Sequence, residues 1–244
     1  MTKRLPQVSY PTYDLVLPSN GKKLKFRPFL VKEEKLLLLA SQEQDVKYST
    51  RTIKDIITNC TYGEVDPDTL PIFDIEWIFL QLRIKSKGSD LRLKYTCNNI
   101  PEGQTEVCGT EINLNLNLEE LEIKKNPEHT KTIKFTEDSG FKLKYPTLDI
   151  FEELESYNSG ADELFGILVK LIDTIYDKDS VTPASDFSEK ELTEWVESFG
   201  ENELDQIYKF FETYPRLSKT LTIKCPKCGH EEQVTLEGLQ SFLF

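Results

Sequence analysis

The sequence has few of the residues from which enzyme active sites are commonly built. It contains only two histidines, His129 and His230, which leaves little material for a histidine-based catalytic triad. It has no glycine-rich phosphate loop of the Walker or Rossmann type. Its paired acidic residues, such as Glu33-Glu34, Glu119-Glu120 and Glu152-Glu153, are adjacent in sequence, and adjacent residues on a helix do not face one substrate. We therefore expect a protein that is not an enzyme and has no small-molecule substrate.

Long apolar runs are also missing. No stretch approaches the ~20 apolar residues of a membrane-spanning helix, and the first residues, MTKRLPQVSYPTYDLV, lack the apolar core of a secretory signal. We expect an intracellular protein without membrane association, whose cysteines are reduced. The chain has five cysteines, and an odd number argues against a framework made only of disulfides.

Basic residues are outnumbered by acidic ones. The chain has 30 Lys and Arg against 42 Asp and Glu, a net charge of −12. Residues 123–244 carry most of it, with 14 basic and 24 acidic residues. An acidic surface repels phosphate, which argues against nucleic-acid binding. The excess fits either a protein partner with a basic patch or a solvated acidic surface.

The sequence does contain a specific cysteine motif near its C-terminal end. The motif Cys225-Pro226-Lys227-Cys228-Gly229 is typical of a zinc knuckle, a tight turn that points two thiolates the same way. The glycine can adopt the left-handed conformation that follows the second ligand. Alternating apolar residues on both sides of the motif predict the strands of a hairpin.

A structural zinc site needs four ligands, and one other part of the chain resembles the motif. Cys97 ends a predicted strand and Cys108-Gly109 precedes another, although ten residues separate the two cysteines. We therefore predict one closed, structural zinc site, with His230 as an alternative ligand, that forms only when both hairpins are folded. Reduced cysteines without metal and a disulfide remain as alternatives. The predicted ligands are Cys97, Cys108, Cys225 and Cys228.

The order of predicted elements occurs twice. A strand pair around Ser19-Asn20-Gly21 precedes helices and the first cysteine hairpin, and a second strand pair from residue 130 precedes helices and the second cysteine hairpin. We predict an α+β fold of two pseudo-repeated halves, joined by the zinc site. The boundaries are an N-terminal arm at 1–12, a first half at 13–123, a linker at 124–129 and a second half at 130–244. Helices are expected at 32–44, 49–60, 74–87, 148–157, 162–175, 188–199 and 202–214, with a loop at 178–186.

Several single residues carry further expectations. Asp74 should cap its helix and Gly88 should end it. Cys60 continues the apolar stripe of its helix, so we expect it to be buried and inert. The apolar run Leu36–Ala40 is expected in the core, with a partner-covered surface as the alternative. The sequence Ser188-x-x-Glu191 predicts a capping box.

Two stretches resemble a known family. LPSNGKKLKFRPFLVKEEKLLLLA (17–40) and LPIFDIEWIFLQLRIKSKG (70–88), with the intervening residues Ile56–Cys60, resemble the T4-type bacteriophage baseplate proteins. These are the small hub subunits and hub-assembly factors of contractile-tailed phages. The resemblance covers residues 17–95, and beyond that only the general layout matches. The residues that carry it are Arg27, Pro28, Phe29, Leu30, Lys32, Glu33, Glu34, Lys35, Asp74, Ile75, Arg83, Ser86 and Gly88.

The resemblance implies a structural or assembly protein of the baseplate hub, with other hub or wedge proteins as partners. It would act in the host bacterial cytoplasm during assembly and, as a second location, in the virion tail baseplate. Arg27 and Glu33 are candidates for a pair that fixes the first hairpin against the first helix. The apolar end Phe242-Leu243-Phe244 and the acidic helices of the second half are candidate partner surfaces.

The cysteine motif alone also permits another function, a zinc-ribbon adapter for nucleic acid or transcription machinery. Such a ribbon should carry basic residues and exposed aromatic residues on its hairpin. Here the second hairpin is balanced in charge, and the first has two basic against three acidic residues. Neither is a basic platform, which favours the assembly protein.

Overall fold

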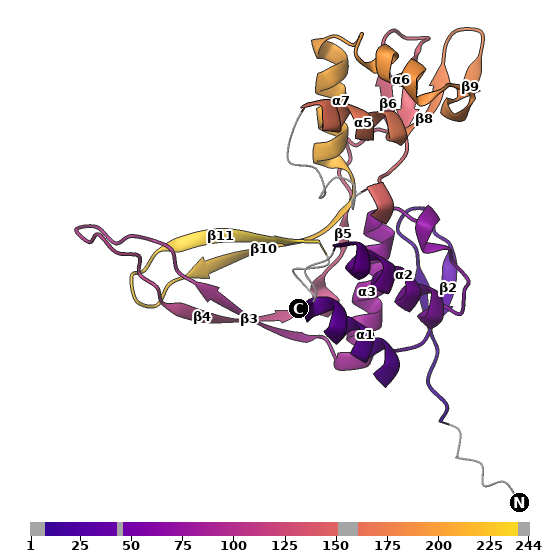
Figure 1. The fold of residues 1–244 in the computed structure, drawn as a ribbon. Coiled ribbons are helices and arrows are strands. Elements are labelled where there is room, and N and C mark those ends of the chain that lie inside the picture. The colour runs from indigo at the N-terminus through magenta and orange to yellow at the C-terminus, as the bar shows by residue number, and fades with distance from the viewer. Residues whose placement is uncertain (1–7, 43–45, 151–160, 239–244) are drawn as a thin grey trace, which may run out of the picture.

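The computed structural model describes residues 8–42, 46–150 and 161–238. Its chain forms three parts: a helical body, a long arm of two β-hairpins, and a second unit of helices and a four-stranded sheet (Figure 1). This mixture of helices with antiparallel sheets confirms the α+β class. In the described residues, no helix combines the length and apolar character needed to cross a bilayer.

The helical body contains the first hairpin and three helices. Its elements are β1 (Tyr13–Val16), β2 (Lys23–Phe26), α1 (Val31–Gln42), α2 (Val46–Cys60), the short 3-10 helix η1 (Pro67–Thr69) and α3 (Ile72–Lys87). The predicted turn between the strands is present, and Gly21 adopts a φ of 72° there. In α3, Ile75, Ile78 and Phe79 are fully buried, so this helix is the centre of the body's core.

The ends of α3 confirm one sequence prediction and correct another. Gly88 ends the helix with a φ of 86° and donates its N–H to Ile84 O at 3.0 Å. The helix begins at Ile72, after Pro71, so Asp74 lies inside the first turn and is not the cap. Its carboxylate is fully buried and accepts hydrogen bonds from the Ser19 amide, at 3.0 Å, and from the Ser19 hydroxyl. Asp74 therefore fixes the β1–β2 turn onto α3.

The apolar run in α1 is only partly in the core. Leu36 and Leu37 pack against the body's core and Ala40 is buried. Leu38 and Leu39 are 58% and 42% exposed. Four consecutive apolar residues span more than one turn of a helix, so they cannot all face the same side.

The arm is built from the two cysteine hairpins. The first is β3 (Asp90–Thr96) with β4 (Glu111–Asn117), and the second is β10 (Arg216–Lys224) with β11 (Glu231–Glu237). After the 3-10 helix η2 (Leu118–Glu120), the short strand β5 (Ile123–Lys124) pairs with the start of β10. The first residue of the expected linker, Lys124, is therefore part of a sheet that joins the middle of the chain to its C-terminal hairpin.

The second unit differs from the helix-rich arrangement that we predicted. Its elements are β6 (Thr132–Lys134), β7 (Gly140–Leu143), α5 (Ala161–Leu171), β8 (Ile172–Tyr176), β9 (Val181–Pro183), the 3-10 helix η3 (Ala184–Asp186), α6 (Glu189–Val196) and α7 (Glu201–Thr213). Strands β6 to β9 form one antiparallel sheet in chain order. The helix expected at 162–175 ends at Leu171, because Ile172–Tyr176 pairs with both β7 and β9. The expected loop at 178–186 contains β9 and η3.

Other predictions in this unit are confirmed or lie outside the described residues. The capping box is present. The Glu191 amide donates to the Ser188 hydroxyl, and the Ser188 amide donates to the Glu191 carboxylate. The helix expected at 148–157 begins at Leu148, and its part beyond 150 is not described. The extra strands β8 and β9 have no counterpart in the body, so the pseudo-repeat stays a prediction that rests on element order.

Helix α3 also connects the body to the root of the arm. Its side chains Leu80 and Ile84 are not part of the body's core. They form a second apolar cluster with Leu116 of β4 and Leu217 of β10. The arm is thus anchored by burial of leucines from both hairpins against one helix. Figure 1 shows the two hairpins side by side as they extend away from this root.

Candidate metal centre

The four predicted ligands lie together at the far end of the arm. Cys97 follows β3 and Cys108 lies shortly before β4, while Cys225 and Cys228 lie in the turn between β10 and β11. Their sulfur atoms are all within 4.8 Å of one another. Because β3–β4 and β10–β11 extend from the same root, their tips meet although 131 positions separate Cys97 from Cys228.

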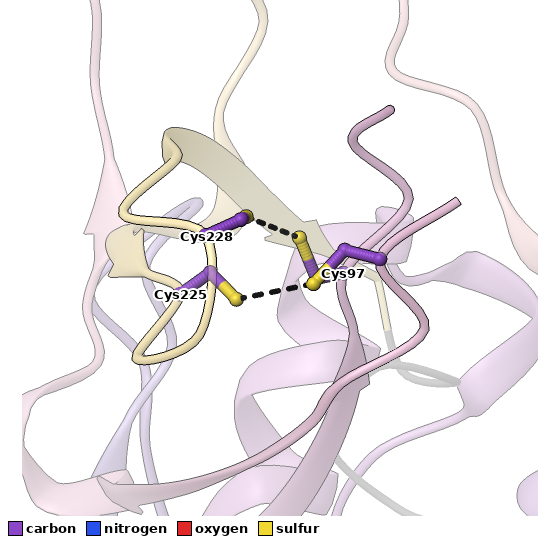
Figure 2. Close-up of side chains that lie close together, drawn as sticks. Cys97, Cys225 and Cys228 are labelled. Carbon is purple, nitrogen blue, oxygen red and sulfur yellow. Dashed lines mark hydrogen bonds between the residues drawn. The ribbon is translucent and has the colours of Figure 1, made fainter. Parts of the chain in front are cut away.

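The distances between the sulfur atoms fit a tetrahedral ion. The Sγ atoms of Cys97 and Cys228 are 3.7 Å apart, and so are those of Cys108 and Cys225. Both contacts run between the two hairpins and not within one (Figure 2). A tetrahedral zinc ion with Zn–S bonds of ~2.3 Å places its sulfur ligands about 3.8 Å apart. The four cysteines can therefore hold a metal ion with little rearrangement.

The second hairpin has the backbone hydrogen bonds of a tight knuckle. The amide of Cys225 donates to His230 O at 2.8 Å, and the amide of Gly229 donates back to Cys225 O at 2.9 Å. Gly229 has a φ of 74°, in the left-handed region where a glycine is favoured. The His230 carbonyl takes part in this frame, and four thiols already complete the cluster without the His230 ring.

The first hairpin has the same frame despite its longer spacing. The Cys97 amide donates to Thr110 O at 3.0 Å, and the Gly109 amide donates to Cys97 O at 3.0 Å. Gly109 has a φ of 64°. Cys97, Cys108, Gly109 and Thr110 thus correspond to Cys225, Cys228, Gly229 and His230. The ten residues between Cys97 and Cys108, 98–107, form a loop outside this hydrogen-bonded frame. We name this segment the tip loop.

Hydrogen bonds to the sulfur atoms favour negative charge at two of the ligands. The backbone amides of Cys228 and Lys227 donate to Cys225 and, against the effect of burial, lower the pKa of its thiol to about 6. The Thr110 hydroxyl and amide likewise lower the pKa of Cys108. Backbone donors of this kind support a metal-bound thiolate.

Cys97 shows what prevents all four thiols from ionising without a cation. The Asn99 amide acts to lower the pKa of Cys97, but burial and the neighbouring thiols outweigh it and raise that pKa to about 12. Like charges a few ångströms apart disfavour one another. A divalent cation among the four sulfur atoms would remove this repulsion.

Cys60 is not part of the cluster. It is fully buried in the body's core at the end of α2. Burial raises the pKa of its thiol to about 12, so it remains a neutral, apolar side chain. This confirms the prediction that Cys60 has a packing role.

A comparison with known families identifies the family of the chain. The family described as "T4 bacteriophage base plate protein" matches residues 10–244, nearly the whole sequence. The chain belongs to this family. Neither the search of curated proteins nor the search of solved structures gave a match. The resemblance noted for residues 17–95 is therefore confirmed and extends through both cysteine hairpins.

In this base plate protein, several of the residues that carried the resemblance form contacts between neighbouring helices and strands. Arg27, directly after β2, and Glu33, in α1, form a buried ion pair with a 2.8 Å contact between Nη2 and Oε1. The Phe29 amide donates to Ser86 Oγ at 2.8 Å, which connects the start of α1 to the end of α3. The predicted Arg27–Glu33 pair is thus confirmed, and its burial indicates an architectural role.

Glu76 of α3 was not among the sequence predictions. It is only 8% exposed and lies at the root of the arm, where its Oε2 accepts the Leu217 amide at 3.3 Å. Burial raises the pKa of this carboxyl to about 7. A single acidic residue among the apolar positions of a helix is a weak signal that this residue is buried.

The predicted contact residues Phe242, Leu243 and Phe244 lie outside the described residues. They remain a prediction from the sequence.

Proposed function

We propose that this base plate protein is a non-enzymatic component of the contractile-tail baseplate hub, either a structural subunit or an assembly factor. Its partners are other hub or wedge proteins. It acts in the host bacterial cytoplasm during assembly, with the virion tail as its second location. Support comes from the family match over residues 10–244, together with an arm that extends away from the body (Figure 1).

The single observation that carries the architectural part is the cluster of four cysteines between the two hairpins. We infer that the ion is zinc, because four thiolates in a tetrahedral arrangement are typical of structural zinc sites. Such a site has no open coordination position for a substrate or an activated water. This supports a structural role for the metal and a chain without catalytic activity.

The alternative adapter for nucleic acid or transcription machinery receives little support from the charges on the arm. Two exposed lysines of the hairpins are paired with glutamates: Lys94 with Glu111 at 3.5 Å, and Lys224 with Glu231 at 2.6 Å. A nucleic-acid surface needs basic side chains that are free to contact phosphates. Paired charges of both signs favour a protein partner.

An affinity-tagged chain expressed during phage infection tests the proposal. Mass spectrometry of the captured complexes and of purified virions should find hub or wedge proteins in the complexes. Presence in virions would identify a structural subunit, and absence would identify an assembly factor. Capture of polymerase subunits or nucleic acid in place of baseplate proteins would contradict the proposal and support the adapter.

A further inference from the structure

The tip loop, residues 98–107, is longer than the metal centre requires. The second knuckle forms the same two backbone hydrogen bonds with only Pro226 and Lys227 between its cysteines. The first knuckle uses ten residues to achieve the same frame, eight more than its counterpart. These extra residues extend beyond the ends of β3 and β4, at the point of the arm farthest from the body (Figure 1).

The tip loop exposes two β-branched apolar side chains. Ile100 is 54% exposed and Val107 is 56% exposed. Single exposed apolar residues are common on protein surfaces. These two occur in one ten-residue loop, close to the base of that loop, where the cysteine cluster holds the backbone.

The loop is held at its base by contacts with the cysteine cluster. The Cys108 amide donates to Asn99 O at 2.8 Å, which closes the loop just inside the two cysteines. The side-chain Nδ2 of Asn99 donates to Cys228 Sγ at 3.7 Å, and Lys227 Nζ donates to Cys108 O at 3.4 Å, so the second hairpin also contacts this base. A loop fixed before binding loses little conformational entropy when a partner covers it.

The charge of the loop indicates the chemistry of its partner. Residues 98–107 contain Glu102 and Glu106, both exposed, and no lysine, arginine or histidine. Four thiolates around a zinc ion would add a net charge of about −2 immediately behind the loop. The basic residue Lys227 of the second knuckle is directed at the Cys108 carbonyl. The apolar side chains of Ile100 and Val107 are therefore surrounded by negative charge. Such a surface is complementary to an apolar pocket bordered by basic side chains.

We propose that the tip loop is a docking element that inserts Ile100 and Val107 into an apolar, basic-rimmed pocket of a neighbouring baseplate protein. This inference rests on the proposed function and names the surface that performs it. The metal centre then has a second purpose, because it fixes the docking loop as well as joining the hairpins.

Site-specific photo-cross-linking in phage-infected cells tests the location. The photoreactive amino acid p-benzoylphenylalanine is placed at position 100 and, as a control, at position 181, where Val181 is 71% exposed on the second unit. We expect a cross-link to a baseplate protein from position 100 and not from 181. A baseplate cross-link from 181 alone would overturn the docking element but leave the proposed function intact. No baseplate cross-link from either position, together with no baseplate protein captured by the tagged chain, would contradict both.

Substitutions then test the chemistry, with the purified baseplate protein that is cross-linked from position 100 as the probe. The double variant Ile100→Asp/Val107→Asp should weaken its binding at least 10-fold, whereas Gln104→Asp, in the same loop, should change it less than 3-fold. Glu102→Lys/Glu106→Lys should also weaken binding and reduce its salt dependence. Unchanged metal content and melting temperature would show that the variants are folded. Equal binding by the Ile100/Val107 variant and the Gln104 control would overturn the proposal.

Discussion

The Sγ atoms of Cys97 and Cys228 lie 3.7 Å apart, although 131 positions separate the two residues in the chain. This contact and the equivalent one between Cys108 and Cys225 join the tips of two hairpins that also share an apolar cluster at the root of the arm. A cross-link over such a long loop restricts the unfolded chain strongly. By analogy with a disulfide that closes a loop of this length, the gain is about 4–5 kcal/mol.

We predict that Cys225→Ser/Cys228→Ser releases the bound metal and lowers the free energy of unfolding by about that amount. Metal content is measured by elemental mass spectrometry on protein purified without oxygen, and stability by urea denaturation. Cys60→Ala is the matched control, because it removes a buried thiol from the core but should leave the metal content unchanged. Wild-type protein without any bound metal would contradict the zinc site.

The buried ion pair between Arg27 and Glu33 leads to a second prediction. Glu33 is 1% exposed, and the hydrogen bonds from Arg27 and from the Leu30 amide outweigh burial and lower the pKa of Glu33. Arg27→Met alone should cost about 3–5 kcal/mol, because it leaves a buried, unpaired carboxylate. Arg27→Met/Glu33→Leu should recover most of that loss. Measured stabilities that are equal for the single and double variants would contradict this account.

An exposed ion pair between α1 and the end of α3 provides the control. Lys87 and Glu34 are 2.9 Å apart, with both side chains nearly half exposed, so Lys87→Ala should cost about 1 kcal/mol or less.

The contribution of Glu33 to stability should also depend on pH. Because its pKa in the folded protein is lowered, this stabilisation is present above the ordinary carboxyl pKa and is lost as the pH falls through the lowered value.

Glu76 should give the opposite pH dependence. Its carboxyl pKa rises from 4.5 to about 7 in the folded protein, so the folded state binds more protons than the unfolded state between these values. Stability should therefore fall by about 3 kcal/mol as the pH rises from 4.5 to above 7. Glu76→Gln should remove this part of the pH profile and be more stable than the wild type at pH 8. Parallel profiles for the two proteins, measured by thermal denaturation, would show that Glu76 is not the responsible group.

Two glycines of the second unit should respond in opposite directions to alanine. A Cβ at Gly140 would lie 2.1 Å from the Ile133 carbonyl oxygen of the paired strand. Gly140→Ala should therefore force β6 and β7 apart and cost several kcal/mol. Gly166, inside α5, has no atom within 4 Å of the added Cβ, so Gly166→Ala should stabilise by about 0.5–1 kcal/mol. Equal effects of the two substitutions in chemical denaturation would contradict the close approach at Gly140.

The sequence predicted the metal cluster because its signals are local. The Cys-Pro-Lys-Cys-Gly turn and the alternating strands around both cysteine pairs define two hairpins before any contact between them is known. The sequence also indicated that the segment around Cys97 and Cys108 resembles this motif, but it did not predict that the two knuckles share the same backbone hydrogen bonds. These are the hydrogen bonds of the Cys97 and Gly109 amides, and the ten-residue separation of Cys97 from Cys108 gave no sign of them.

The failures of sequence reasoning have a common physical origin in distant partners. Residues Ile172–Tyr176 continue the helical apolar pattern of α5, but β7 and β9 offer them hydrogen bonds on both sides. Asp74 has the residue type of a helix cap, and Ser19, 55 positions away, determines its actual role. In each case a tertiary contact overrides a local preference.

The pairing of β5 with β10, and of the two cysteine turns, also determines when the arm can form. A ribosome synthesises Cys97 well before Cys228, and at ~5–20 residues per second the interval of 131 positions lasts roughly 7–26 s. During that time β3 and β4 have neither their facing hairpin nor the second pair of thiols. The first hairpin is therefore an incomplete half-site in the nascent chain until β10 and β11 follow. A chain interrupted before β10 would leave one apolar face of this hairpin and its two cysteines uncovered.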